Sequence, residues 1–226
     1  MSLHKPDMVL FDLDGTLVDS VPDLANAINS MLDTLGCTTQ PVERIRLWIG
    51  NGLERLIKRA LTGEMDAEPD KMLYERAYPV FMNYYRNNTC CESRLYDGVQ
   101  TALDYLDNNG FKVGCVTNKM EVFTHSILRK LGIYDAFGII ISGDTLPRKK
   151  PDPLPLTHAA QYFNVRSEDS LMIGDSGSDI QAAHAAGFCV WCVTYGYNQG
   201  NDIRVFGPDA VLDSLEQLPE MLGRLT

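Results

Sequence analysis

Asp12 and Asp14, two aspartates with one residue between them, follow an apolar run and are followed by Gly15 and Thr16. Alternate residues of a strand point to the same face, so the two carboxylates start out parallel and repel each other. A purely structural strand gains nothing from that repulsion. The pair is useful if a cation lies between the acids, or if one acid stays ionised while the other carries a proton.

Further polar residues follow other apolar runs of the chain. Thr117 and Asn118 follow one run, Lys150 directly precedes a proline, and Asp175 and Asp179 follow another run. Taken singly, the acids could be helix caps, Thr117 an ordinary strand residue and Lys150 a solvated lysine. In open α/β sheets, however, ligands bind beyond the carboxyl ends of the strands. We therefore expect these side chains to gather at one edge of a sheet.

Short apolar runs predict the strands that carry these residues, at 8–14, 112–118, 137–143, 171–175, 189–196 and 210–214. The runs are nearly continuous rather than alternating, which indicates strands covered on both faces, as in a parallel sheet. Helical patterns separate the later runs. The predicted fold class is therefore α/β, with a Rossmann-like parallel sheet as its core.

The segment between the first two predicted core strands has a different pattern. Residues 20–92 contain no convincing strand and predict three helices, at 21–35, 42–61 and 69–85. The segment is too long for a simple crossover connection. We expect a small α-helical cap domain at 19–92, inserted into a core domain made of 1–18 and 93–226.

The composition excludes several classes of protein. The chain has 226 residues, of which 45% are hydrophobic, and a net charge of −10. This acidity argues against nucleic-acid binding, and no apolar run is long enough to span a membrane. No leader segment is apparent, so we expect a cytoplasmic protein whose six cysteines are reduced thiols. The pair Cys189 and Cys192 is expected to belong to a strand rather than to a redox or metal site, because no partner set accompanies it.

Four short motifs resemble those of the haloacid dehalogenase superfamily, in its branch of Mg²⁺-dependent phosphatases. They are Asp-Leu-Asp-Gly-Thr at 12–16, Thr117, Lys150 before Pro151, and Gly-Asp-Ser-Gly-Ser-Asp at 174–179. The resemblance covers nearly the whole chain, and the helical insert resembles a cap placed between the first two motifs. It implies the cofactor Mg²⁺ and a small-molecule phosphate monoester as substrate.

The resemblance also implies a role for each residue. Asp12 is the expected nucleophile, forming an aspartyl-phosphate, and Asp14 the general acid and base. Asp12, Asp175 and the backbone carbonyl of Asp14 are the expected Mg²⁺ ligands. The remaining residues are expected to bind phosphate or to support the site: Gly15, Thr16, Thr117, Asn118 and Lys150 at the phosphoryl group, with Ser176 and Asp179 behind the metal ligands.

A loop in the predicted cap bears on the substrate. Gly50, Asn51 and Gly52 open a helix, where exposed N–H groups can meet a small anion, although a plain connection between helices fits the residue types equally well. The segment resembles the cap of bacterial phosphoglycolate phosphatases. This implies 2-phosphoglycolate as substrate, with its carboxylate bound by the loop, Arg44 or Arg55.

Several alternatives share these motifs. A phosphatase for a sugar phosphate, a nucleotide or pyrophosphate would keep the whole set, and so would a sugar phosphomutase. A dehalogenase needs neither Asp14 nor the metal. A phosphorylation switch, which is not an enzyme, also joins acids, a threonine and a lysine around Mg²⁺, but distributes its acids differently and lacks a large cap. The sequence leaves open whether the chain is a monomer or a homodimer.

Overall fold

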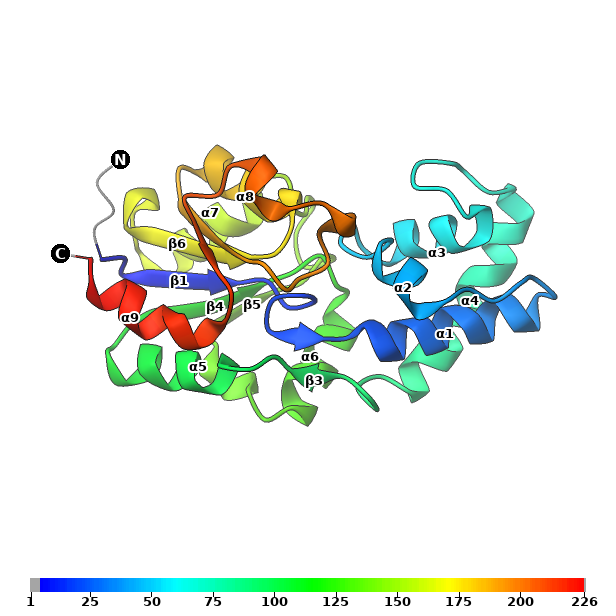
Figure 1. Ribbon diagram of the computed structural model, residues 1–226, viewed down its shortest axis with the longest axis horizontal. Helices are drawn as coiled ribbons and strands as arrows, with labels where there is room; N and C mark the ends of the chain where they lie inside the picture. The colour runs from blue at the N-terminus through cyan, green and yellow to red at the C-terminus, as the bar shows by residue number, and fades with distance from the viewer. Residues whose placement is uncertain (1–4, 226) are drawn as a thin grey trace.

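The computed structural model describes residues 5–225 and contains one six-stranded sheet in which every neighbouring pair of strands is parallel. The order is β5-β4-β1-β6-β7-β8, so β1 is central (Figure 1). The strands are β1 (Met8–Phe11), β4 (Lys112–Val116), β5 (Ile139–Ile141), β6 (Ser170–Gly174), β7 (Cys189–Val193) and β8 (Ala210–Leu212). Each lies within a predicted apolar run, except that β6 begins one residue before its run, at Ser170. The α/β class is confirmed.

Both faces of the sheet are covered by helices, which explains the continuous apolarity of the strands. Val9 and Phe11 pack into a cluster with residues of α5, α6 and α9, whereas Met8 and Leu10 pack with residues of α7 and α8 on the other face. All four side chains are fully buried. The covering helices are α5 (Val99–Asn108), α6 (Glu121–Lys130), α7 (Leu154–Phe163), α8 (Gly177–Ala186) and α9 (Leu218–Gly223).

Four further helices lie beyond the carboxyl ends of the strands (Figure 1). They are α1 (Val21–Thr34), α2 (Val42–Arg46), α3 (Leu53–Thr62) and α4 (Lys71–Asn87). They enclose an apolar cluster of their own, in which Ile28 and Phe81 are fully buried. The domain boundaries at 18/19 and 92/93 stay predictions, and residues 1–4 and 226, assigned to the core, lie outside the described residues.

The predicted helix at 42–61 is interrupted. Helix α2 ends at Arg46 and α3 begins at Leu53. Gly50 and Gly52 between them have φ angles of +122° and +87°. An α-helix requires φ near −63°, so the backbone cannot stay helical through these two positions.

A two-stranded antiparallel ribbon, which the sequence did not predict, forms where the chain passes from the sheet to helices α1–α4, here called the helical layer, and back. These two passages of the chain are called the crossings. Strand β2 (Val18–Asp19) pairs with β3 (Arg94–Leu95). Next to it, the buried Asp23 accepts hydrogen bonds from the Ser93 amide at 2.9 Å and the Ser93 hydroxyl at 2.5 Å. These contacts satisfy a buried carboxylate and fix the two crossings side by side.

The described residues contain no helix that is both long enough and apolar enough to cross a membrane. All six cysteines are free thiols, and Cys189 and Cys192 lie at the first and fourth positions of β7, as predicted.

Candidate active site

Asp12 extends β1 beyond its last residue, because its amide donates to Ile173 of the neighbouring strand at 2.9 Å. Its Oδ1 atom accepts from the Leu13 amide at 2.7 Å and lies 3.0 Å from Lys150 Nζ. No residue in the described range donates a hydrogen bond to Oδ2. Burial raises the pKa of Asp12 to about 6, against the opposing effect of the Lys150 charge and with a further increase from Asp179.

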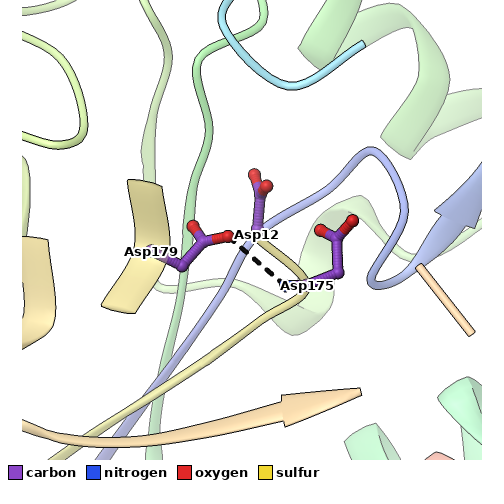
Figure 2. Close-up of side chains that lie close together, drawn as sticks. All are labelled: Asp12, Asp175 and Asp179. Atoms are coloured by element: carbon purple, nitrogen blue, oxygen red, sulfur yellow. Dashed lines mark hydrogen bonds between the residues drawn. The ribbon is translucent and has the colours of Figure 1, made fainter. Parts of the chain in front are cut away.

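Asp12, Asp175 and Asp179 form a compact acidic cluster at the carboxyl edge of the sheet. Figure 2 shows the three side chains, and one oxygen of each lies within 4.8 Å of the others. Asp175 Oδ1 accepts from the Thr16 hydroxyl at 3.0 Å. Burial, followed by the charges of Asp12 and Asp179, raises the pKa of Asp175 well above its ordinary value.

The acidic cluster fits a divalent cation. The buried Asp175 and Asp179 and the half-buried Asp12 face one buried ammonium, Lys150. An excess of negative charge results when all four groups are ionised. Carboxylate oxygens are the ligands that Mg²⁺ prefers. Placing a divalent cation among them would offset the repulsion that raises the pKa of Asp175.

Lys150 is the cation of the cluster, and it is almost fully buried. Its Nζ atom lies 2.7 Å from Asp179 Oδ1 and donates to the Val116 carbonyl at 2.5 Å. Burial alone would lower the pKa of Lys150, but Asp12 and Asp179 reverse this effect and hold it above its usual value. The neighbouring Lys149 is exposed, which agrees with the choice of Lys150 for the site.

Asp179 and Ser176 organise the loop that carries Asp175. Asp179 Oδ2 accepts from the amide of Asp175 at 3.3 Å (Figure 2). It also accepts from the amide and the hydroxyl of Ser176, at 3.0 and 2.7 Å. These bonds satisfy donors at the first turn of α8, where a carboxylate is favourable. Asp179 and Ser176 thus fix the loop that carries Asp175, and their role beside the metal ligands stays a prediction.

Asp14 faces a different partner. Its two carboxylate oxygens each lie 3.1 Å from Lys119 Nζ, and Oδ1 also accepts from the Ser20 hydroxyl at 2.5 Å. Its carboxylate lies outside the acidic cluster. Lys119 is buried, and the sequence analysis missed it, although it directly follows Asn118. Burial would lower the pKa of Lys119, but Asp14 outweighs burial and raises it.

Gly15 and Thr16 form a tight turn against Asp175. Gly15 has a φ of +91°, and a Cβ atom there would lie 2.3 Å from Asp175 Oδ2. The amides of Gly15 and Thr16 donate to carbonyls within the turn, Val18 at 2.9 Å and Leu13 at 3.3 Å. Neither amide is thus a free donor for phosphate in this structure, which differs from the expectation for both residues.

Thr117 and Asn118 follow β4 and lie beside the two aspartates of the first motif. The Thr117 hydroxyl accepts from the Lys119 amide at 3.2 Å. The Asn118 side chain donates to the carbonyls of Lys150 at 3.0 Å and Gly50 at 3.4 Å. Asn118 therefore connects the loop that carries Lys150 to the helical layer.

The loop 50–52 lies where the helical layer meets the sheet edge. Asn51 Oδ1 accepts from Arg59 Nη2 at 2.9 Å and from Gln199 Nε2 at 2.7 Å, and its carbonyl accepts from Lys149 at 3.2 Å. Gly52 approaches Lys149 so closely that a Cβ atom would lie 2.9 Å from its Nζ. The loop is thus a contact between the two parts of the chain.

The two arginines proposed to bind a carboxylate, Arg44 and Arg55, lie away from Asp12. Arg44 donates to the Gly63 carbonyl at 2.9 Å, and Arg55 forms ion pairs with Asp66 at 3.0 Å and Glu68 at 2.8 Å. Neither lines a cavity that contains Asp12.

Two adjoining cavities open in front of the aspartates. The smaller, of about 50 Å³, lies toward α1, α3 and α4, and the larger, of about 240 Å³, lies toward Asp175 and Ser176. Asp12, Asp14 and Gly50 line both. The reactive residues therefore face a space between the sheet edge and the helical layer.

Comparison with known proteins identifies the family. The sequence profile of the haloacid dehalogenase-like hydrolases matches residues 9–193. The chain belongs to this family. It is therefore a hydrolase, and the acidic cluster lies at the motifs that carried the resemblance.

Several proteins similar to this chain are named phosphoglycolate phosphatase. A phosphoglycolate phosphatase from Nitrosococcus oceani is 51% identical over 98% of this chain and 99% of its own length. One from Colwellia psychrerythraea is 46% identical over 99% of this chain and 100% of its own. The crystal structure of a predicted phosphoglycolate phosphatase from Haemophilus somnus superimposes with a TM-score of 0.90, at 35% identity, over 97% of this chain and 99% of that one.

Proposed function

We propose that the protein is a Mg²⁺-dependent phosphatase that hydrolyses 2-phosphoglycolate to glycolate and phosphate through an aspartyl-phosphate on Asp12. The observation that carries this proposal is the position of Asp12, which lines both cavities and has one oxygen held by Lys150 and the Leu13 amide while no described residue donates to the other. The names of the relatives support the substrate.

Asp12, Asp175 and the Asp14 carbonyl would hold Mg²⁺. When bound, the ion supplies positive charge that offsets the negative charge of the phosphate group. Asp179 keeps Asp175 and Lys150 in place through the contacts described above.

The first half of the reaction belongs to the two aspartates of the first motif. Asp12 Oδ2 forms a bond to phosphorus while the bond from phosphorus to the ester oxygen breaks. Asp14 acts as the general acid and gives a proton to the departing oxygen, so that glycolate leaves. Lys150 and the Thr117 hydroxyl stabilise the charge on the phosphoryl oxygens.

The second half returns the enzyme to its starting state. A water molecule attacks phosphorus, Asp14 takes its proton, and the bond to Asp12 Oδ2 breaks to release phosphate. Helices α1–α4 would act as a cap domain, at 19–92, that excludes bulk water while the intermediate exists. The hydrogen bonds of Asn51 to Gln199 and Lys149 would mark the closed position.

The test is phosphate release from a panel of monoesters that includes 2-phosphoglycolate, in Mg²⁺ and in chelator. We expect Mg²⁺-dependent release selective for 2-phosphoglycolate, and none from a folded Asp12→Asn variant. Asp107→Asn, at an exposed position of α5, is the matched control and should keep full activity. Normal release by Asp12→Asn would exclude the mechanism, and preference for another monoester would exclude the substrate.

A further inference from the structure

Tyr85, from α4, lines the smaller cavity beside Lys119. The residue is almost fully buried, and its ring packs 4.6 Å from the ring of Phe123. Its hydroxyl oxygen has no hydrogen-bond partner within residues 5–225. A buried hydroxyl without a partner costs free energy, so a bound acceptor would explain its retention there.

Lys119 lines the same cavity from the sheet side. Its Nζ atom lies 5.2 Å from the centre of the Tyr85 ring and donates to both oxygens of Asp14. An ammonium group has three protons, so one remains beyond the two used on Asp14. Against the lowering effect of burial, Asp14 and then the neighbouring Tyr85 side chain raise the pKa of Lys119. Burial raises the pKa of Tyr85 to about 12, so its hydroxyl remains a donor at neutral pH.

The other walls of this cavity limit what can bind there. Leu24, Leu53 and Leu56 supply apolar surface, and Lys119 is the single cation among the described residues that line it. The volume of about 50 Å³ suits a compact group rather than a sugar. A carboxylate is compact, carries one negative charge and offers acceptors to both an ammonium and a phenol.

We infer that Lys119 and Tyr85 form a subsite that binds a carboxylate on the leaving group of the substrate. The inference rests on the proposed function, in which Asp14 protonates the leaving oxygen. Because Lys119 contacts Asp14, a carboxylate held by Lys119 lies beside that oxygen. In 2-phosphoglycolate a single methylene separates the ester oxygen from the carboxylate. Lys119 and Tyr85 thus replace Arg44 and Arg55, which the sequence suggested as ligands of the carboxylate.

Two non-hydrolysable phosphonates test the subsite by calorimetry in Mg²⁺. In 3-phosphonopropionate a methylene replaces the ester oxygen of 2-phosphoglycolate, and propylphosphonate lacks the carboxylate. We expect the unsubstituted protein to bind the first at least about tenfold more tightly. Tyr85→Phe, which removes only the hydroxyl, should reduce this preference at least about fivefold, and Lys119→Met should do the same. Tyr84→Phe, on the same helix but outside the cavity, should retain it.

The outcomes separate the subsite from the proposed function. Equal binding of the two phosphonates by the unsubstituted protein, or a preference unchanged by Tyr85→Phe, overturns the subsite even where phosphate is released from monoesters. A preference that depends on Tyr85, in a protein that hydrolyses no monoester, supports the subsite and overturns the phosphatase. Lys119→Met also leaves Asp14 without its ion pair. If Lys119→Met does not fold for this reason, Tyr85→Phe alone tests the subsite.

Discussion

The backbone N–H of Tyr197 donates a hydrogen bond to Asp175 Oδ2 at 2.7 Å. The hydroxyl of the same tyrosine accepts from the Ser20 amide at 2.8 Å and donates to Asp19 Oδ1 at 3.0 Å. One buried residue after β7 thus connects a carboxylate of the acidic cluster to the first crossing into the helical layer.

Removing the Tyr197 hydroxyl should destabilise the protein. In Tyr197→Phe the fully buried Ser20 loses the acceptor of its amide, so we expect the free energy of unfolding to fall by about 1–3 kcal/mol. Urea denaturation measures the change. Tyr162→Phe is the control, because Tyr162 is 62% exposed and should change stability by less than about 0.5 kcal/mol. Equal effects of the two variants would contradict the prediction.

The stability of the metal-free protein should depend on pH through Asp12. Burial raises its pKa from the ordinary 3.8 to about 6, so the folded chain binds this proton more readily than the unfolded chain. The favourable contribution is complete below about pH 4 and is lost as pH rises through 6.

Asp12→Asn removes this titration, together with the charge of Asp12 that contributes to the raised pKa of Asp175. Between pH 4 and 7 the unsubstituted protein should therefore lose up to about 3 kcal/mol of stability relative to the variant. Urea unfolding of both proteins in chelator, at the two pH values, gives the comparison. Parallel pH profiles would show that Asp12 has no such shift.

Lys150 and Lys149 are neighbours with opposite surroundings, which makes them a matched pair. Lys150→Met leaves Asp12 and Asp179 buried without their cation and should cost about 3–5 kcal/mol of stability in metal-free protein. Lys149→Met removes an exposed charge and should cost less than about 0.5 kcal/mol. Thermal and urea unfolding report both values, and similar losses would show that the buried ion pairs do not stabilise the fold.

Gly15 cannot accept a side chain without displacing Asp175. We expect Gly15→Ala to lose phosphate release and more than about 2 kcal/mol of stability, because φ is +91° and the new Cβ would overlap the carboxylate. Gly110→Ala is the control: its φ is +72° but nothing lies within 4 Å, so only the backbone cost of about 1 kcal/mol applies. Full activity in Gly15→Ala would contradict the close approach.

The sheet was predictable because its physical cause is local. A strand such as β1 is buried on both faces, so its residues must be apolar without interruption, and that pattern is visible in the sequence. The polar residues after β1, β4 and β6 follow from the same reasoning, since parallel strands end at one edge. For this reason the sequence predicted Asp12, Thr117 and Asp175 together.

Other features depend on contacts that no local pattern contains. The break between α2 and α3 follows from two positive φ angles at glycines, which also occur in ordinary helix ends. Strands β2 and β3 have two residues each, too short for any periodicity. Lys119 is separated from Asp14 by 105 residues, and its position after Asn118 was the only sequence signal for it.

The ribbon of β2 and β3 determines which part of the chain can be replaced by protein engineering. Val18 pairs with Leu95 and Asp19 with Arg94, so the chain leaves the sheet edge and returns to it one strand spacing apart. A two-residue hairpin can close such a gap. We therefore expect that joining Asp19 to Arg94 by a short turn, in place of the helices between them, leaves the register of the six-stranded sheet unchanged.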